Sequence, residues 1–268
     1  MFLTLFSIEW TRLTRRTLLW VTFAACSLFI WLSLQNFYDM NRIQLLDGSL
    51  KMPGFSFDLA NSLDQILLIA QPFLVIMTAL MLGNDYSQRT NQHWFMRTAR
   101  SSSLLSKFAL LALVILFLQF LTLLVGGLTG WYYKTFMYHA FSLNNVNWLA
   151  ALLAAFYMTL VMLPYAAFML LVTVATRSTF AGIAIGLGYT QFVEILMTSI
   201  FYNSRWAMLL MRNLYFSATY LLNSIGNKTV EIPAQLLPPV PAFFVAAVYT
   251  FLFLTLAVRL YRRQDVGG

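Results

Sequence analysis

The amino-acid sequence predicts an all-α membrane protein that crosses the bilayer several times, and three observations support this. First, 60% of the 268 residues are hydrophobic and only 10% are charged, whereas a soluble domain carries about 25% charged residues. Second, the hydrophobic residues form runs of roughly 20 residues, the length that a helix needs to cross the hydrocarbon core. Third, lysine and arginine lie at the ends of these runs, as membrane orientation and anionic lipid headgroups favour. The net charge of +8 therefore does not indicate nucleic-acid binding.

Six apolar runs have the length and composition of transmembrane helices. Pro72 and Pro164 lie in the middle of the second and fourth runs and are expected to kink those helices. No internal repeat is evident, which weighs against transporters built from duplicated halves. The predicted spans are Thr17–Gln35, Leu63–Gly83, Phe108–Tyr132, Trp148–Val174, Thr179–Phe201 and Val240–Leu260.

The segment Met1–Arg16, before the first span, is predicted to be an amphipathic helix lying in the membrane interface. A floppy basic leader is the alternative. The first apolar run, at about 19 residues, is too long for the hydrophobic region of a signal peptide, and no A-x-A cleavage site follows it. At helical spacing, one face would carry Phe2, Phe6, Trp10 and Leu13, and the other would carry Thr4, Thr11, Arg12 and Arg15.

The distribution of basic residues predicts that both termini are cytoplasmic. With the N-terminus inside, the inner segments hold eleven of the 17 lysines and arginines, and the outer loops hold Arg42, Lys51, Lys134, Arg205, Arg212 and Lys228. The acidic residues Asp39, Asp47, Asp58, Asp64 and Glu231 all fall outside in this arrangement.

Two segments on the outer side need separate interpretation. Residues 206–222 are apolar enough to resemble a seventh span, but Arg212 lies in their middle, and a central charge costs about 3 kcal/mol. We therefore expect an outer-face helix or a half-inserted hairpin within a segment, 202–239, that precedes the last span. The first outer loop, 36–62, contains Gly48, Pro53 and Gly54 and is expected to be long and irregular.

The motifs of common catalytic sites do not occur in this sequence. There is no G-x-x-x-x-G-K-[ST] motif to hold a nucleotide phosphate, and no H-E-x-x-H, G-x-S-x-G or C-x-x-C. The single cysteine, Cys26, cannot form an internal disulfide or a cysteine-based metal site. His93 and His139 fall on loops of opposite sides. We therefore expect neither enzymatic activity nor a cofactor or metal on this chain.

The fifth span contains the polar pair Gln191 and Glu194. A carboxylate inside a membrane is costly and by default suggests function. Glu194 could be a proton site, a cation contact or a polar hinge. Alternatively, it lies near the outer end of the span, in a water-filled cleft or paired with an outer basic residue.

Glycines form two clusters in the spans. Gly182, Gly186 and Gly188 give G-x-x-x-G-x-G in the fifth span, and Gly126, Gly127 and Gly130 lie near the outer end of the third. Small residues let helices approach closely, so we expect both clusters to pack within the bundle or against another subunit.

The polar run at residues 84–107, NDYSQRTNQHWFMRTARSSSLLSK, is almost purely basic and lies between the second and third spans. Such a run is typical of a large cytoplasmic loop. Trp94 and Phe95, with Met96, could form an apolar plug in a docking interface, with Arg97 and Arg100 as its polar rim. Alternatively, the aromatic residues lie on the lipid headgroups.

This loop resembles the coupling segment of the permease subunits of type-2 ATP-binding-cassette exporters. That segment runs as an acid, a Gly-Thr pair, a Pro-x-x-Arg turn and a lysine. Asp85, Thr90 and Lys107 match the acid, the threonine and the lysine, and Arg100 lies within one residue of the arginine position. Arg89 replaces the glycine, and the turn proline is absent. The layout of the whole chain, from N-terminal helix to last span, is similar to that family.

The resemblance implies half of an export pathway. A second copy or a homologous permease would complete the pathway, and a separate ATPase subunit would bind ATP and magnesium. The loop 84–106 would be the coupling segment, and the outer segment 202–239 would form part of an extracellular gate. The membrane would be the bacterial plasma or inner membrane. The alternative is a stand-alone secondary transporter or channel that uses Glu194. The residues expected to contact the ATPase are Asp85, Arg89, Thr90, Trp94, Phe95, Arg97 and Arg100.

Overall fold

The protein is all-α throughout the part of the chain that its structure, a computed structural model, describes. The described residues are 2–46, 54–87, 100–139, 148–201, 208–223 and 236–263. No strand occurs among them, so the predicted fold class is confirmed.

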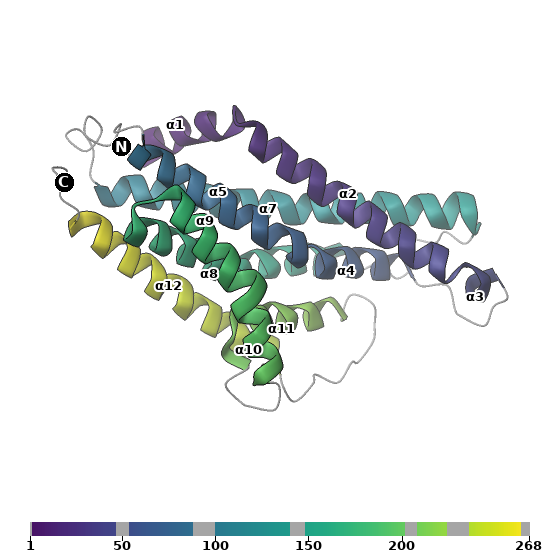
Figure 1. Cartoon of the computed structure of the whole chain (residues 1–268). Helices are drawn as coiled ribbons and strands as arrows, with labels where there is room; N and C mark the ends of the chain where they lie inside the picture. Colours follow the sequence, from purple (N-terminus) through teal and green to yellow (C-terminus); the bar gives the residue numbers. More distant parts are fainter. Residues whose placement is uncertain are drawn as a thin grey trace.

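The helices lie along one long bundle (Figure 1). The first half of the chain contains α1 (Phe2–Thr14), α2 (Thr17–Met40), α3 (Arg42–Leu46), α4 (Phe55–Gln65), α5 (Leu67–Ser87), α7 (Arg100–Tyr132) and the π-helical turn η1 (Tyr133–Met137). The second half contains α8 (Trp148–Thr176), α9 (Thr179–Leu187), η2 (Gly188–Val193), α10 (Glu194–Ile200), α11 (Met211–Asn223) and α12 (Pro239–Arg263).

Five helical segments of the described chain are long and apolar enough to cross a membrane, or six if a bent pair counts as one span. The bent pair is Phe55–Gln65 with Ile69–Gly83, and its members meet at 44°. These segments match the six predicted spans, which supports a multi-pass membrane protein. The five are Thr17–Met40, Ser101–Met137, Trp148–Thr176, Thr179–Ile200 and Pro239–Arg263.

The expectation of an irregular first outer loop was wrong for most of its length. The helix α2 continues to Met40, and α3 and α4 follow within the same segment. In α4, Phe55, Leu59 and Leu63 recur every four residues and are all buried. Such a stripe packs one face of a helix against neighbouring helices. Because α4 is amphipathic and short, it has no long apolar run by which a search for spans would find it.

The helix α8 is the centre of the bundle and packs against α5, α7, α11 and α12. Within its most apolar stretch, 67% of the residues are buried, against 17% to 39% in the other four candidate spans. Its buried face contains several alanines, and small residues let neighbouring helices approach closely. Both α5 and α8 continue helically through their prolines, Pro72 and Pro164.

Most of the predicted glycine contacts lie inside the bundle. A methyl group on Gly182 would meet Thr173 and Ala79, and one on Gly186 would meet Met169 and Val75, so both glycines face α5 and α8. A methyl group on Gly188 would meet nothing within 4 Å. Close packing within the bundle therefore accounts for two of the three glycines in the fifth span.

The glycines of α7 face α4. A methyl group on Gly130 would lie 2.5 Å from Cγ of Asp58, and one on Gly126 would lie 2.5 Å from Cβ of Ser62. Gly127 is near the ring of Phe55, at 3.4 Å. The small residues of α7 therefore provide the space in which α4 lies.

The beginning of α1 and the end of α12 lie at the same end of the bundle (Figure 1). The rings of Tyr86, at the end of α5, and Tyr261, near the end of α12, are 6.4 Å apart at this end. At the opposite end, α2, α4 and α7 extend beyond the other long helices (Figure 1). Both chain ends are thus expected on one side of a membrane, and which side it is stays a prediction.

Candidate functional site at the junction of α1, α5 and α7

The predicted coupling segment is described only at its two ends. Residues 84–87, including Asp85, form the last turn of α5, and Arg100 begins α7. The remaining predicted contact residues lie outside the described residues; they are Arg89, Thr90, Trp94, Phe95 and Arg97. What the structure does describe is how the two helices that flank 88–99 are held.

A buried ion pair holds α1 against the start of α7. Nζ of Lys107 donates a hydrogen bond to Oε1 of Glu9 over 2.7 Å. The side chain of Lys107 is fully buried and that of Glu9 is 13% exposed. Removing one partner from a buried pair costs roughly 3–5 kcal/mol because the other charge is left uncompensated. The pair therefore fixes where α1 lies on α7.

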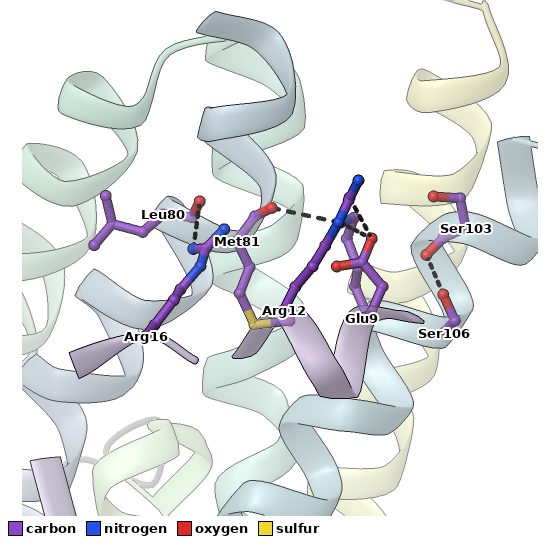
Figure 2. Close-up of polar contacts among 8 residues, drawn as sticks. Glu9, Arg12, Arg16, Leu80, Met81, Ser103 and Ser106 are labelled. Carbon is purple, nitrogen blue, oxygen red and sulfur yellow. Dashed lines mark hydrogen bonds and ion pairs between the residues drawn. The ribbon is translucent and has the colours of Figure 1, made fainter. Parts of the chain in front are cut away.

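The same lysine also reaches α5. Nζ of Lys107 lies 3.5 Å from the carbonyl oxygen of Met81. The preceding residue of α5 is bonded as well: Nη1 of Arg16 donates a hydrogen bond to the carbonyl oxygen of Leu80 over 3.2 Å. Figure 2 shows Arg16 bonded to Leu80, with Glu9 and Met81 both joined by dashed lines to the amino group between them. Both helices that flank 88–99 are therefore bonded to the N-terminal segment: α7 to Glu9 on α1, and α5 to Arg16, which lies between α1 and α2. We call this meeting point of α1, the end of α5 and the start of α7 the junction.

Two further contacts complete this junction. Nη1 of Arg12 lies 3.6 Å from Oε1 of Glu9, one turn along α1. The hydroxyl of Ser106 donates to the carbonyl oxygen of Ser103 over 2.8 Å in the first turns of α7 (Figure 2). Ser106 is fully buried, so this turn of α7 faces the bundle.

The end of α5 also lies close against α9. A methyl group on Gly83 would lie 2.8 Å from the backbone Cα of Thr179, the first residue of α9. Before it, Arg177 takes a left-handed conformation with φ 52°, and the hydroxyl of Ser178 accepts a hydrogen bond from the amide of Ala181. The tight turn between α8 and α9 thus brings the fifth span against the second beside the junction.

The predicted N-terminal helix is present, but its apolar residues face the bundle. Leu5 and Leu13 are buried, and Phe6 and Trp10 pack against the core. The exposed positions of α1 are mainly polar or basic, including Ser7, Thr11 and Arg12. Its placement in the membrane interface stays a prediction, because the packing by itself only places α1 on α7.

Glu194 lies buried at the start of α10, and Gln191 lies in the preceding turn, η2. The hydroxyl of Tyr165, on α8, donates to both carboxylate oxygens, at 3.0 and 2.9 Å. Oε1 also accepts the backbone amide of Arg212, at the start of α11, over 2.6 Å. The carboxylate therefore joins three helices, and its role as a proton site, a cation contact or a polar hinge stays a prediction. Gln191, although half-buried, forms no hydrogen bond with Glu194 in this part of the structure.

A second buried charge pair lies at the opposite end of the bundle, and sequence reasoning missed it. Asp58, on α4, accepts from Nζ of Lys134, in η1, and from the hydroxyl of Tyr38, on α2, over 2.6 Å. Tyr38 stacks on Tyr133 with ring centroids 4.8 Å apart. Sequence analysis assigns both charges to outer loops, so their pairing appears only when the helices are packed.

The buried polar contacts described above join helices to one another. No three His, Cys, Asp or Glu side chains of the described residues come together in a way that could hold a metal ion. A scan against protein-family models finds no match for this chain, and a search of curated proteins finds none either.

Proposed function

We propose that this chain is the membrane permease subunit of an ATP-driven exporter of the type-2 ATP-binding-cassette kind. It forms half of the translocation pathway in this proposal and carries no ATP site of its own. The observation that carries the proposal is the bonding of both helices that flank 88–99 to the N-terminal segment. Lys107 of α7 bonds to Glu9 of α1 and lies against Met81 of α5, and Arg16, between α1 and α2, bonds to Leu80 of α5.

The reason is mechanical. An ATPase below the membrane can act on the spans only through a stiff element that contacts both the ATPase and the spans. A short segment between two free helix ends would move without displacing the bundle. Because α1, α5 and α7 are bonded together, a push on 88–99 moves the second and third spans as one body.

The partners follow from this assignment. A second copy of the chain or a homologous permease completes the pathway, and a separate ATPase subunit binds ATP and magnesium. Both chain ends and the 84–106 segment face the cytoplasm of a bacterial cell, and α11, within 202–239, faces outward as part of the gate. The cargo fits the apolar character of the spans: a lipid, a hydrophobic peptide or a drug-like compound.

Substituting the aromatic residues of the segment tests the coupling. We expect Trp94→Glu or Phe95→Glu to abolish ATP-driven transport, because a charge in an apolar interface is costly to bury. The protein should still insert and should no longer copurify with its ATPase. Met40→Glu, an exposed apolar position at the opposite end of the bundle, is the matched control and should retain copurification.

Two results would contradict the proposal. One is normal ATP-driven transport in Trp94→Glu. The other is transport by this chain alone in liposomes without ATP, which would favour the stand-alone transporter. In that case Glu194→Gln should abolish the flux, whereas in an ATP-driven exporter transport should still require ATP and the partner subunit.

A further inference from the structure

We propose that α11 is a latch that joins the fifth candidate span to the bend between α4 and α5, so that a change at Glu194 is transmitted to the helix break at Ile66. This inference does not depend on whether the protein binds an ATPase. It rests on two attachments within the first turns of α11.

The first attachment is at the N-terminus of α11. The first amides of a helix have no partner within the helix, and a negative charge placed there is stabilising. Arg212 is the second residue of α11, and its amide donates to the carboxylate of Glu194 over 2.6 Å. Glu194 thus caps α11 from a different helix. Tyr165 holds the carboxylate in place from the other side.

The second attachment is one turn along α11. The hydroxyl of Tyr215 donates to the carbonyl oxygen of Leu63 over 2.5 Å. Tyr215 is fully buried. Burial, with a smaller contribution from the charge of Asp64, raises the pKa of this phenol well above its usual value. The phenol therefore keeps its proton at physiological pH and remains a hydrogen-bond donor.

The position of Leu63 explains why this bond matters. α4 ends at Gln65 and α5 begins at Leu67, with Ile66 between them. At such a break, carbonyl groups in the last turn of the first helix lack a partner within the helix. Beyond the break, the amides of Ile69 and Ala70 both donate hydrogen bonds to the carbonyl oxygen of Ile66, over 3.2 and 2.8 Å. Tyr215 thus supplies a donor to the last turn of α4.

The local sequence does not account for the bend. Helix kinks are almost always caused by Pro, by Gly/Ser pairs, by π-bulges or by a side chain inserted into the hydrogen-bond ladder. Residues 63–68, LDQILL, contain neither proline nor glycine. Pro72 has no amide hydrogen to donate to the carbonyl oxygen of Leu68. Because Leu68 lies after the break, this missing hydrogen bond does not explain the bend. The structure does show a side chain that bonds into the ladder at this point, because the hydroxyl of Tyr215 donates to the carbonyl oxygen of Leu63.

The two attachments lie on one rigid element. Arg212 and Tyr215 are three residues apart, so both bonds are made within one helical turn. Leu214 and Ala218 are buried on the same helix, and α11 packs between α8 and α12 while also contacting α4 and α10. A displacement of the start of α11 therefore changes both bonds together, and α11 connects the fifth span with the bent second span.

Hydrogen exchange of the full chain in lipid nanodiscs tests the second attachment. Tyr215→Phe removes only the phenolic oxygen. We expect the amides at 67–70 to exchange about fivefold faster, the factor for one lost hydrogen bond of ordinary strength. Tyr132→Phe, at a ring that is 45% exposed, is the matched control and should leave these amides unchanged.

Glu194→Gln tests the transmission itself. Glu194 bonds to α8 and α11 but not to α4. We still expect the amides at 67–70 to exchange about two- to fivefold faster, because the loss of charge at the N-terminus loosens α11. Glu9→Gln, at the other end of the bundle, should not affect them.

The outcomes separate cleanly. Faster exchange at 67–70 in Glu194→Gln, with α8 unchanged, supports the latch even if Tyr215→Phe fails to fold. Unchanged exchange at 67–70 in Glu194→Gln, or an equal increase in every helix, overturns it. Unchanged exchange at 67–70 would show that the two attachments are independent. An equal increase in every helix would show that Glu194 affects only global stability.

Discussion

At the scale of single residues, buried charges decide where the helices meet. Asp58, Lys134 and Lys107 are each fully or almost fully buried, and each has a partner on another helix. A buried ion pair adds little net stability because desolvation offsets most of its attraction. Its main effect is specificity, because any arrangement that separates the partners leaves an uncompensated charge. These pairs therefore select one packing among several that would bury similar apolar area.

The pair of Asp58 and Lys134 can be tested by removing its partners singly and together. We expect Lys134→Met to lower the free energy of unfolding by roughly 3–5 kcal/mol, because Asp58 is left buried without its cation. The double variant Asp58→Asn with Lys134→Met should recover much of this loss. Thermal unfolding in detergent measures the effect. A double variant that is less stable than the worse single variant would contradict the interpretation.

At the scale of elements, α1 serves as a clamp rather than as a free surface helix. Its apolar side chains pack against the core and its Glu9 bonds to α7, while Arg16, which follows α1 directly, bonds to α5. Three elements that are distant in the sequence thus form one junction. A small residue also lets a further helix approach the junction: Gly83 leaves the space in which α9 lies against α5. The clamp follows from residue contacts, whereas its role in transmitting force belongs to the proposed function.

A double-mutant cycle on Glu9 and Lys107 tests the clamp. We expect Glu9→Gln and Lys107→Met each to destabilise the protein and their effects to be non-additive by about 0.5–3 kcal/mol, as for residues in direct contact. The cycle of Glu9→Gln with Lys134→Met, at opposite ends of the bundle, is the control and should be additive. Additive effects of Glu9→Gln and Lys107→Met would show that the pair is not energetically coupled.

At the scale of the whole molecule, the bundle is longer than a membrane is thick. The segment Ser101–Met137 contains 37 residues, which corresponds to about 55 Å of helix, whereas the hydrocarbon core is about 30 Å thick. An end of α7 must therefore project from the membrane or the helix must tilt strongly. The Asp58 and Lys134 pair lies at the end that extends beyond the other long helices (Figure 1).

The orientation of the molecule can be measured by thiol labelling in a Cys26→Ala background. We expect a membrane-impermeant maleimide to label Arg42→Cys in intact cells and Arg177→Cys only after permeabilisation. Both arginines are exposed and lie at opposite ends of the bundle, so accessibility reports the side of the membrane. The reverse labelling pattern would place the termini and the 84–106 segment outside and would end the proposal of a cytoplasmic ATPase.

Several elements could be predicted from the sequence because their signals are local. The apolar runs located the five candidate spans of the described chain and the longer member of the bent pair, and the charge of Arg212 excluded residues 206–222 as a span, which fits the short helix α11. The N-terminal helix followed from the spacing of aromatic residues. Conversely, α4 escaped prediction because its apolar stripe is short and its partner surface, the glycines of α7, is some 70 residues away in the chain.

The composition and periodicity of the sequence by themselves determined an all-α chain with the spans of a multi-pass membrane protein, since the hydrophobic length of a helix is a property of consecutive residues. Only the tertiary structure decided the pairing of Glu9 with Lys107 and of Asp58 with Lys134, the capping of α11 by Glu194, and the bend at Ile66. The physical reason is that a buried charge or an unsatisfied carbonyl is stabilised by whichever partner the packing brings within hydrogen-bond distance, and that partner leaves no mark in the neighbouring sequence.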